Sequence, residues 1–113
     1  MNVASPTVIR NLERLLAGGR DSALLRFSLG NEYLKVGQFG TAITHLTRAV
    51  EHSPDYSAAW KLLGKASLEV HDEAAARRAW TTGISIAETR GDKQAAREMS
   101  VFLRRLDKQP AKD

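Results

Sequence analysis

The sequence predicts an all-α fold of about six helices, stacked as antiparallel helix hairpins in one domain that spans residues 1–113. The main observation is an internal repeat at a spacing of 34 residues, a period typical of stacked helical hairpins. Between the repeated positions, apolar residues recur at helical spacing, bounded by residues that typically begin or end helices. The repeat consists of six identical pairs: Leu29 and Leu63, Gly30 and Gly64, Leu34 and Leu68, Val36 and Val70, Ala42 and Ala76, Thr47 and Thr81.

Three helices are predicted in the N-terminal half of the chain. A Ser-Pro pair opens the first, expected over residues 5–18, and two glycines end it. Asp21 or Ser22 caps the second helix, which continues to about Val36. A Gly-Gln-Phe turn leads into the third helix, over residues 39–52.

The next two helices begin at typical start signals. A Ser-Pro-Asp run at residues 53–55 is expected to begin a helix that reaches about Val70. Asp72 and Glu73 then place carboxylates where the dipole of a new helix favours negative charge. This helix is expected to continue to about Thr89, one turn beyond the corresponding part of the earlier hairpin.

The last helix follows a Gly-Asp pair and has one apolar face. That face is formed by Ala95, Met99, Phe102, Leu103 and Leu106. We interpret residues 91–108 as a capping helix, because the open end of a repeat array needs a cover with a polar outer face. The tail, residues 109–113, is expected to fray.

Residues between the identities resemble the tetratricopeptide repeat family, in particular its small bacterial members. Trp60, Leu63 and Gly64 reproduce the W-x2-L-G opening of the family, while the first copy keeps the later tyrosine as Tyr33. The resemblance implies a right-handed superhelical stack. It divides the chain into a possible half repeat at 5–18, repeat 1 at 23–56 and repeat 2 at 57–90.

Small residues inside the helices predict close packing between neighbouring helices. Glycine in a helix interior costs about 1 kcal/mol relative to alanine, so Gly30, Gly64 and Gly83 indicate a close approach. Both tryptophans, Trp60 and Trp80, are expected to pack beside such residues and not to serve as ligand-stacking rings.

Composition argues against several classes of function. The chain has no cysteine, which excludes disulfides and thiolate metal sites and suits a reducing compartment. No apolar run approaches the roughly 20 residues that a membrane-spanning helix needs, and the first residues do not resemble a secretory signal. We therefore expect a cytoplasmic protein without membrane association.

Charge and reactive side chains give no sign of nucleic-acid binding or catalysis. The net charge is +4, but basic residues are scattered among acidic ones without a basic run. His45, His52 and His71 lack further ligands at metal-site spacing, and we expect His45 and His52 to be solvated. The sequence predicts no enzyme, no cofactor and no metal.

The resemblance implies instead a concave groove, lined by the first helix of each hairpin, that takes an extended peptide or a helix of a partner protein. The residues on this face would be Leu24, Phe27, Asn31, Leu34, Lys35, Ala58, Lys61, Lys65, Leu68 and Glu69. Lys61 and Lys65 stand one helical turn apart and repel each other, which an acidic partner would relieve. The apolar members suggest an amphipathic partner.

A homodimer is the alternative. Leu24 and Phe27, or the outer face of the last helix, would then bury themselves against a second copy of the chain.

Overall fold

The structure is a computed structural model that describes the backbone of residues 4–108 and the side chains of residues 6–108. Within these residues the chain forms six α-helices and no strand, so the predicted all-α fold is confirmed. The helices are α1 (Ala4–Ala17), α2 (Ala23–Lys35), α3 (Phe39–His52), α4 (Ser57–Glu69), α5 (Glu73–Arg90) and α6 (Lys93–Asp107). None of them is both long and apolar enough to cross a membrane.

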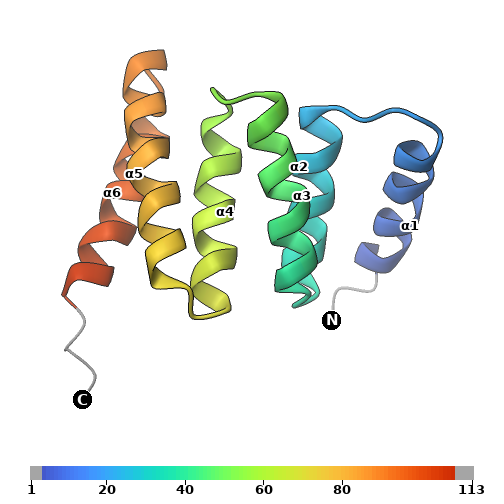
Figure 1. Ribbon diagram of the computed structural model, residues 1–113, viewed down its shortest axis with the longest axis horizontal. Helices are drawn as coiled ribbons and strands as arrows, with labels where there is room; N and C mark the ends of the chain where they lie inside the picture. Colours follow the sequence, from blue (N-terminus) through green and yellow to red (C-terminus); the bar gives the residue numbers. More distant parts are fainter. Residues whose placement is uncertain (1–3, 109–113) are drawn as a thin grey trace.

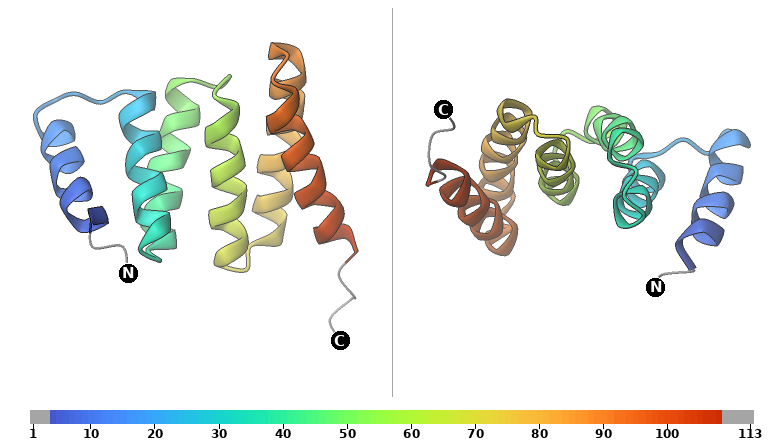
Figure 2. Two further views of the ribbon diagram at one scale, coloured as in Figure 1. Left: turned by 180° about the vertical axis from the view of Figure 1, so that it is seen from behind. Right: turned by 90° about the horizontal axis from the view of Figure 1, so that it is seen from below.

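Consecutive helices lie side by side in a row, with α1 at one end and α5 and α6 at the other (Figure 1). The two further views show the same stack from behind and from below (Figure 2). Besides sequential neighbours, α2 contacts α4 and α4 contacts α6, whereas the backbones of α3 and α5 stay further apart, with no Cα atoms within 8 Å of each other. The helices therefore converge on the side of α2, α4 and α6, which we call the inner face; α3 and α5 form the outer face.

Glycines mark the places where neighbouring helices approach most closely, as the sequence predicted. A Cβ atom on Gly30 would lie 2.5 Å from Cγ of Leu46, on the facing helix α3. A Cβ atom on Gly83 would lie 2.5 Å from Sδ of Met99, on α6. Leu46 and Met99 are fully buried, so these close approaches form part of the core.

Both tryptophans have the expected packing role. Trp80 is only 2% exposed and belongs to the core cluster between α5 and α6. Trp60 is partly buried and packs against two core clusters, while its indole N–H donates a hydrogen bond of 2.8 Å to the carbonyl of Pro54.

Side-chain caps begin three of the helices. Ser22 accepts a hydrogen bond from the amide of Leu25, Asp72 from that of Ala75 and Asp92 from that of Ala95. These contacts satisfy amide groups that have no partner within the first turn of a helix.

The start of α4 differs from the sequence-based expectation. The Ser-Pro-Asp run does not begin the helix, because the amide of Tyr56 donates to the carbonyl of Ser53 in a turn and α4 starts only at Ser57. The expected extension of α5 is confirmed, since this helix continues to Arg90.

That extension changes the spacing of the last helix. α6 begins at Lys93, two residues later than a 34-residue spacing from the start of α4 would place it. Met99 and Ser100 thereby occupy the places that Leu63 and Gly64 hold in α4. The register of α6 is therefore shifted by two residues relative to the 34-residue repeat.

Candidate functional site

Two of the predicted site residues contact α6 on the inner face. The ammonium group of Lys61 forms an ion pair of 3.0 Å with Oε1 of Glu98. The ammonium group of Lys65 lies over the ring of Phe102, 5.7 Å from its centroid. The repulsion expected between these lysines is therefore relieved at Lys61 by a carboxylate of the same chain.

A pocket of about 270 Å³ opens between the second halves of α4 and α6, and we call it the α4–α6 pocket. It is lined by Lys65, Leu68, Glu69, Trp80, Phe102, Arg105 and Leu106. The apolar members pack against or belong to the core, while Lys65, Glu69 and Arg105 are exposed. The pocket thus has an apolar floor and a charged rim with two cations and one carboxylate.

Phe27 and Leu34 belong to the packing between helices. The ring of Phe27 lies 4.9 Å from the ring of Tyr56, centroid to centroid, and it touches two core clusters. Leu34 packs against the cluster that contains Leu46. These two residues therefore do not form an exposed apolar patch with Leu24, because α3 and α4 cover them.

Leu24 faces the other end of the stack. It is 66% exposed and lines an apolar pocket with Leu12 and Leu15 of α1. Ala58 lies elsewhere again, in a polar pocket beside the turn between α5 and α6. Leu24 and Ala58 are thus separated from the α4–α6 pocket.

Lys35 and Asn31, the remaining two predicted site residues, lie on α2 away from the α4–α6 pocket. Lys35 is exposed and forms an ion pair of 3.0 Å with Glu32 within α2. Asn31 is partly buried. Of the ten predicted residues, the structure brings Lys65, Leu68 and Glu69 together in one pocket.

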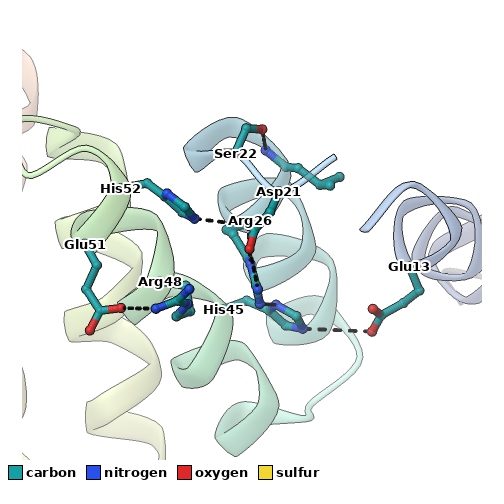
Figure 3. Close-up of polar contacts among 9 residues, drawn as sticks. Glu13, Asp21, Ser22, Arg26, His45, Arg48, Glu51 and His52 are labelled. Carbon is teal, nitrogen blue, oxygen red and sulfur yellow. Dashed lines mark hydrogen bonds and ion pairs between the residues drawn. The ribbon is translucent and has the colours of Figure 1, made fainter. Parts of the chain in front are cut away.

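A polar cluster that sequence reasoning missed connects α1, α2 and α3 (Figure 3). The guanidinium of Arg26 donates two hydrogen bonds, of 2.8 and 2.9 Å, to the carboxylate of Asp21. His52 contacts the same carboxylate at 3.1 Å. Hydrogen bonding to Arg26 is the main cause that lowers the pKa of Asp21 well below its usual range.

His45 lies at the centre of this cluster, and the expectation that it is solvated is wrong. Only 7% of the residue is exposed, because the turn of α3 that carries it faces α2. Nη1 of Arg26 lies 3.1 Å from Nδ1 of His45. A guanidinium only donates, so Nδ1 accepts and the neutral ring carries its proton on Nε2, 3.9 Å from Glu13.

Burial lowers the pKa of His45, and the positive charge of Arg26 acts in the same direction against the opposing effect of Glu13. The ring also stacks on Tyr33, with centroids 5.5 Å apart and planes at 4°. The cluster therefore favours a neutral imidazole.

Tyr33 connects this cluster to α1. Its hydroxyl donates a hydrogen bond of 2.5 Å to Oε2 of Glu13. This bond, together with burial, raises the pKa of Tyr33 to about 12. Within residues 6–108, no group of three or more His, Cys, Asp and Glu side chains is arranged to hold a metal ion. We interpret the cluster as a structural contact that holds α1 against α2 and α3.

Three α6 residues of the inner face were also missed: Glu98, Phe102 and Arg105. From the sequence, Phe102 is expected on the apolar face that covers the open end of the array, and no role is assigned to Glu98 and Arg105. The available signal was the spacing of three between Phe102 and Arg105, which places a ring and a cation on one side of a helix.

Comparisons with known proteins identify the family. Residues 23–66 match the tetratricopeptide repeat family. A TPR repeat-containing protein of Pseudomonas aeruginosa is 55% identical over 101 residues, which cover 89% of this chain and 96% of that protein. The chain belongs to the tetratricopeptide repeat family.

A solved structure supports the fold of this family member. The solution structure of a protein from Bordetella parapertussis is 47% identical, with a TM-score of 0.78, and the match covers 88% of this chain and 87% of that one. Proteins built from tetratricopeptide repeats generally serve as protein–protein interaction modules, so the surface of the stack is where function is expected.

Proposed function

We propose that this protein is a non-catalytic adaptor whose inner face binds an acidic, amphipathic segment of a partner protein. The observation that carries the proposal is the α4–α6 pocket, where an apolar floor lies beside the cationic groups of Lys65 and Arg105. Neither cation forms an ion pair with another side chain of residues 6–108, so both are available to a carboxylate. The absence of cysteine favours a cytoplasmic setting for this role.

A protein partner fits the charges better than a nucleic acid does. Although the net charge is +4, carboxylates of the same chain neutralise Arg26, Arg77 and Arg90 in ion pairs. Phosphate backbones are bound by continuous basic surfaces, and such pairs interrupt the basic surface. A short acidic segment needs only the local pair of cations at the α4–α6 pocket.

Site-specific photo-crosslinking tests which face binds. A photoreactive amino acid replaces Glu69, an exposed residue of the α4–α6 pocket whose charge the acidic partner does not need, or, as the matched control, Thr82, an exposed residue that lines a pocket of the outer face. Both variants are incubated with lysate, irradiated and analysed by mass spectrometry. We expect a protein adduct at position 69 that is absent at position 82; adducts at position 82 alone would overturn the proposal.

A homodimer is the second candidate, favoured by the apolar end of the stack. Leu24 is 66% and Leu15 is 44% exposed, and Val8 also lies open on α1. Burial of these residues against a second copy predicts a concentration-dependent mass in sedimentation velocity. The substitution Leu24→Ser would return the protein to a monomer, whereas a constant monomer mass in the wild type would exclude this candidate.

A further inference from the structure

We propose that the α4–α6 pocket is an anchor site for one large apolar side chain that is flanked by a carboxylate in the partner segment. This inference rests on the proposed function and specifies the chemistry of the partner.

The size of the pocket sets the size of the occupant. Its volume is about 270 Å³, below the roughly 300–1,000 Å³ of sites that enclose a small-molecule ligand. A phenylalanine or leucine side chain fits this space, which is smaller than the space that encloses a drug-sized ligand. The pocket therefore takes one side chain of a longer segment, and the rest of that segment lies along the inner face.

The floor of the pocket explains why the occupant is apolar. Leu68 and Phe102 are partly buried hydrophobic residues that pack against the core cluster containing Trp80. The rings of Phe102 and Trp80 are in contact, with centroids 5.2 Å apart, so the buried Trp80 supports the floor of the pocket. An entering aromatic ring would contact Phe102 and Leu68 without rearranging the helices.

The rim explains why a carboxylate accompanies the apolar side chain. The ammonium group of Lys65 already lies over the ring of Phe102, at the mouth of the pocket. Arg105 contributes a second cation from α6, and its planar guanidinium suits a carboxylate. Both groups would attract a carboxylate next to the inserted side chain.

Glu69 gives the site a direction. It lies one helical turn beyond Lys65 on α4 and lines the same pocket, so it repels a carboxylate placed at that end. Arg105 follows Phe102 by three residues on α6 and therefore lies near the level of Glu69, so the partner's carboxylate is expected on the side of Lys65. Removing the charge of Glu69 would strengthen binding of an acidic segment.

The test uses three blocked tripeptides and the full chain labelled with ¹⁵N. The probe is acetyl-Glu-Phe-Glu-amide. Its uncharged counterpart is acetyl-Gln-Phe-Gln-amide, and its counterpart without an aromatic ring is acetyl-Glu-Ala-Glu-amide. The two indole N–H resonances report separately, because Trp80 lines the pocket and Trp60 points to the carbonyl of Pro54.

We expect acetyl-Glu-Phe-Glu-amide to shift the Trp80 indole resonance and the amides of Lys65 and Phe102, but not the Trp60 indole. The glutamine tripeptide should bind about two- to fivefold more weakly, the effect of a solvent-exposed ion pair. The alanine tripeptide should not shift the Trp80 indole. Equal binding of the glutamic acid and glutamine tripeptides would overturn the assignment of the cations.

Three charge variants locate the site. Lys65→Gln should weaken binding of the acidic tripeptide, and Glu69→Gln should strengthen it. Arg78→Gln makes the same change of charge on the outer face and should leave binding unchanged. Equal weakening by Lys65→Gln and Arg78→Gln would show a general charge effect and overturn the pocket assignment.

This experiment and the crosslinking experiment fail independently. A crosslinked partner at position 69 together with no tripeptide shift up to the solubility limit would retain the inner face and overturn the anchor site. Tripeptide binding with crosslinks only at position 82 would overturn the proposed partner surface.

Discussion

The backbone of Gly64 in α4 lies directly against the indole ring of Trp80 in α5. A Cβ atom at Gly64 would come within 2.5 Å of Cε2 of Trp80, well inside the contact distance of two carbon atoms. The indole N–H is fixed as well, because it donates a hydrogen bond of 3.1 Å to the carbonyl of Lys61. The ring therefore has little freedom to move away, and the same pair of positions one repeat earlier is Gly30 and Leu46.

This contact predicts that Gly64→Ala is destabilising. Overpacking of a core typically costs about 1–3 kcal/mol, partly offset by the roughly 1 kcal/mol by which alanine favours a helix. We expect a net loss of up to about 2 kcal/mol in the free energy of unfolding, measured by urea denaturation.

Gly40→Ala is the matched control in α3, where a Cβ atom would meet nothing within 4 Å. There the same substitution should be neutral or stabilising by up to about 1 kcal/mol. Equal stability changes at both positions would contradict the packing explanation of Gly64.

The backbone conformation of His71 leads us to predict that a substitution there stabilises the protein. It is the only residue other than glycine with a positive φ among the described residues, at 64°, and it corresponds to Gly37, at 80°, one repeat earlier. The left-handed conformation costs a residue with a side chain about 1–2 kcal/mol. His71→Gly should therefore raise the free energy of unfolding by about 0.5–1 kcal/mol, after the entropy that glycine gains in the unfolded chain.

The opposite change at Gly37 serves as its control. Gly37→Ala should be destabilising although no atom lies within 4 Å of the new Cβ, because the cost comes from the backbone. Thermal denaturation followed by circular dichroism measures both. A destabilised His71→Gly variant would show that the imidazole has a role beyond the turn.

His45 predicts a loss of stability in mildly acidic solution. Its pKa is lowered in the folded state, mainly by burial, from an ordinary value of 6.5. The unfolded chain therefore binds a proton more readily than the folded chain. The resulting stabilisation is fully present above about pH 6.5 and is lost as the pH falls through the lower pKa of the folded state.

Urea denaturation at a series of pH values between neutral and mildly acidic measures this effect. His45→Gln keeps an acceptor for Arg26 but does not titrate, so the dependence on pH should become flatter in this range. An unchanged slope would contradict the assignment to His45. The pKa of Asp21 is also lowered, but its stabilisation is fully present above its ordinary pKa of 3.8 and is lost only below that pH, outside the range of this measurement.

We predict that removal of the Glu13 carboxylate destabilises α1 locally. The backbone of this helix approaches only α2, so the bond from Tyr33 to Glu13 is one of few contacts that hold it. Glu13→Ala should cost about 1 kcal/mol, because the carboxylate is partly exposed. Hydrogen exchange of the α1 amides should then be about fivefold faster.

The amides of α4 to α6 serve as the internal reference for this variant and should exchange at the rate of the wild type. Glu13→Gln keeps an oxygen acceptor for the hydroxyl of Tyr33. Its α1 amides should exchange at a rate between those of the wild type and of Glu13→Ala. Faster exchange throughout the chain would show that the cluster supports the whole fold and not α1 alone.

Much of the fold could be predicted because its signals are local. The 34-residue repeat, the caps and the mid-helix glycines predicted six helices and the close approaches at Gly30 and Gly83. The exact start of α4 was not predicted, because Ser53 and Tyr56 form a turn where the sequence signal for a helix start is equally good. The expected exposure of His45 was also wrong, because a hydrogen bond from Arg26 on the facing helix satisfies its ring nitrogen in the core.

The candidate site was predicted less well than the fold. Lys65, Leu68 and Glu69 lie together in one pocket, but Phe27 and Leu34 pack between helices and Leu24 faces α1. The exposure of a side chain on a helix depends on which neighbouring helices cover it, and tertiary packing decides which helices those are.

The sequence by itself determined the helical repeat, because the period of its small and apolar residues is recorded along the chain. The tertiary structure alone decided which side chains face one another. One extra turn of α5 shifts α6, and this shift places Glu98 beside Lys61 and Phe102 beneath Lys65. Such pairs join residues more than 30 positions apart, so their contacts depend on the angle and register of whole helices and not on any local pattern.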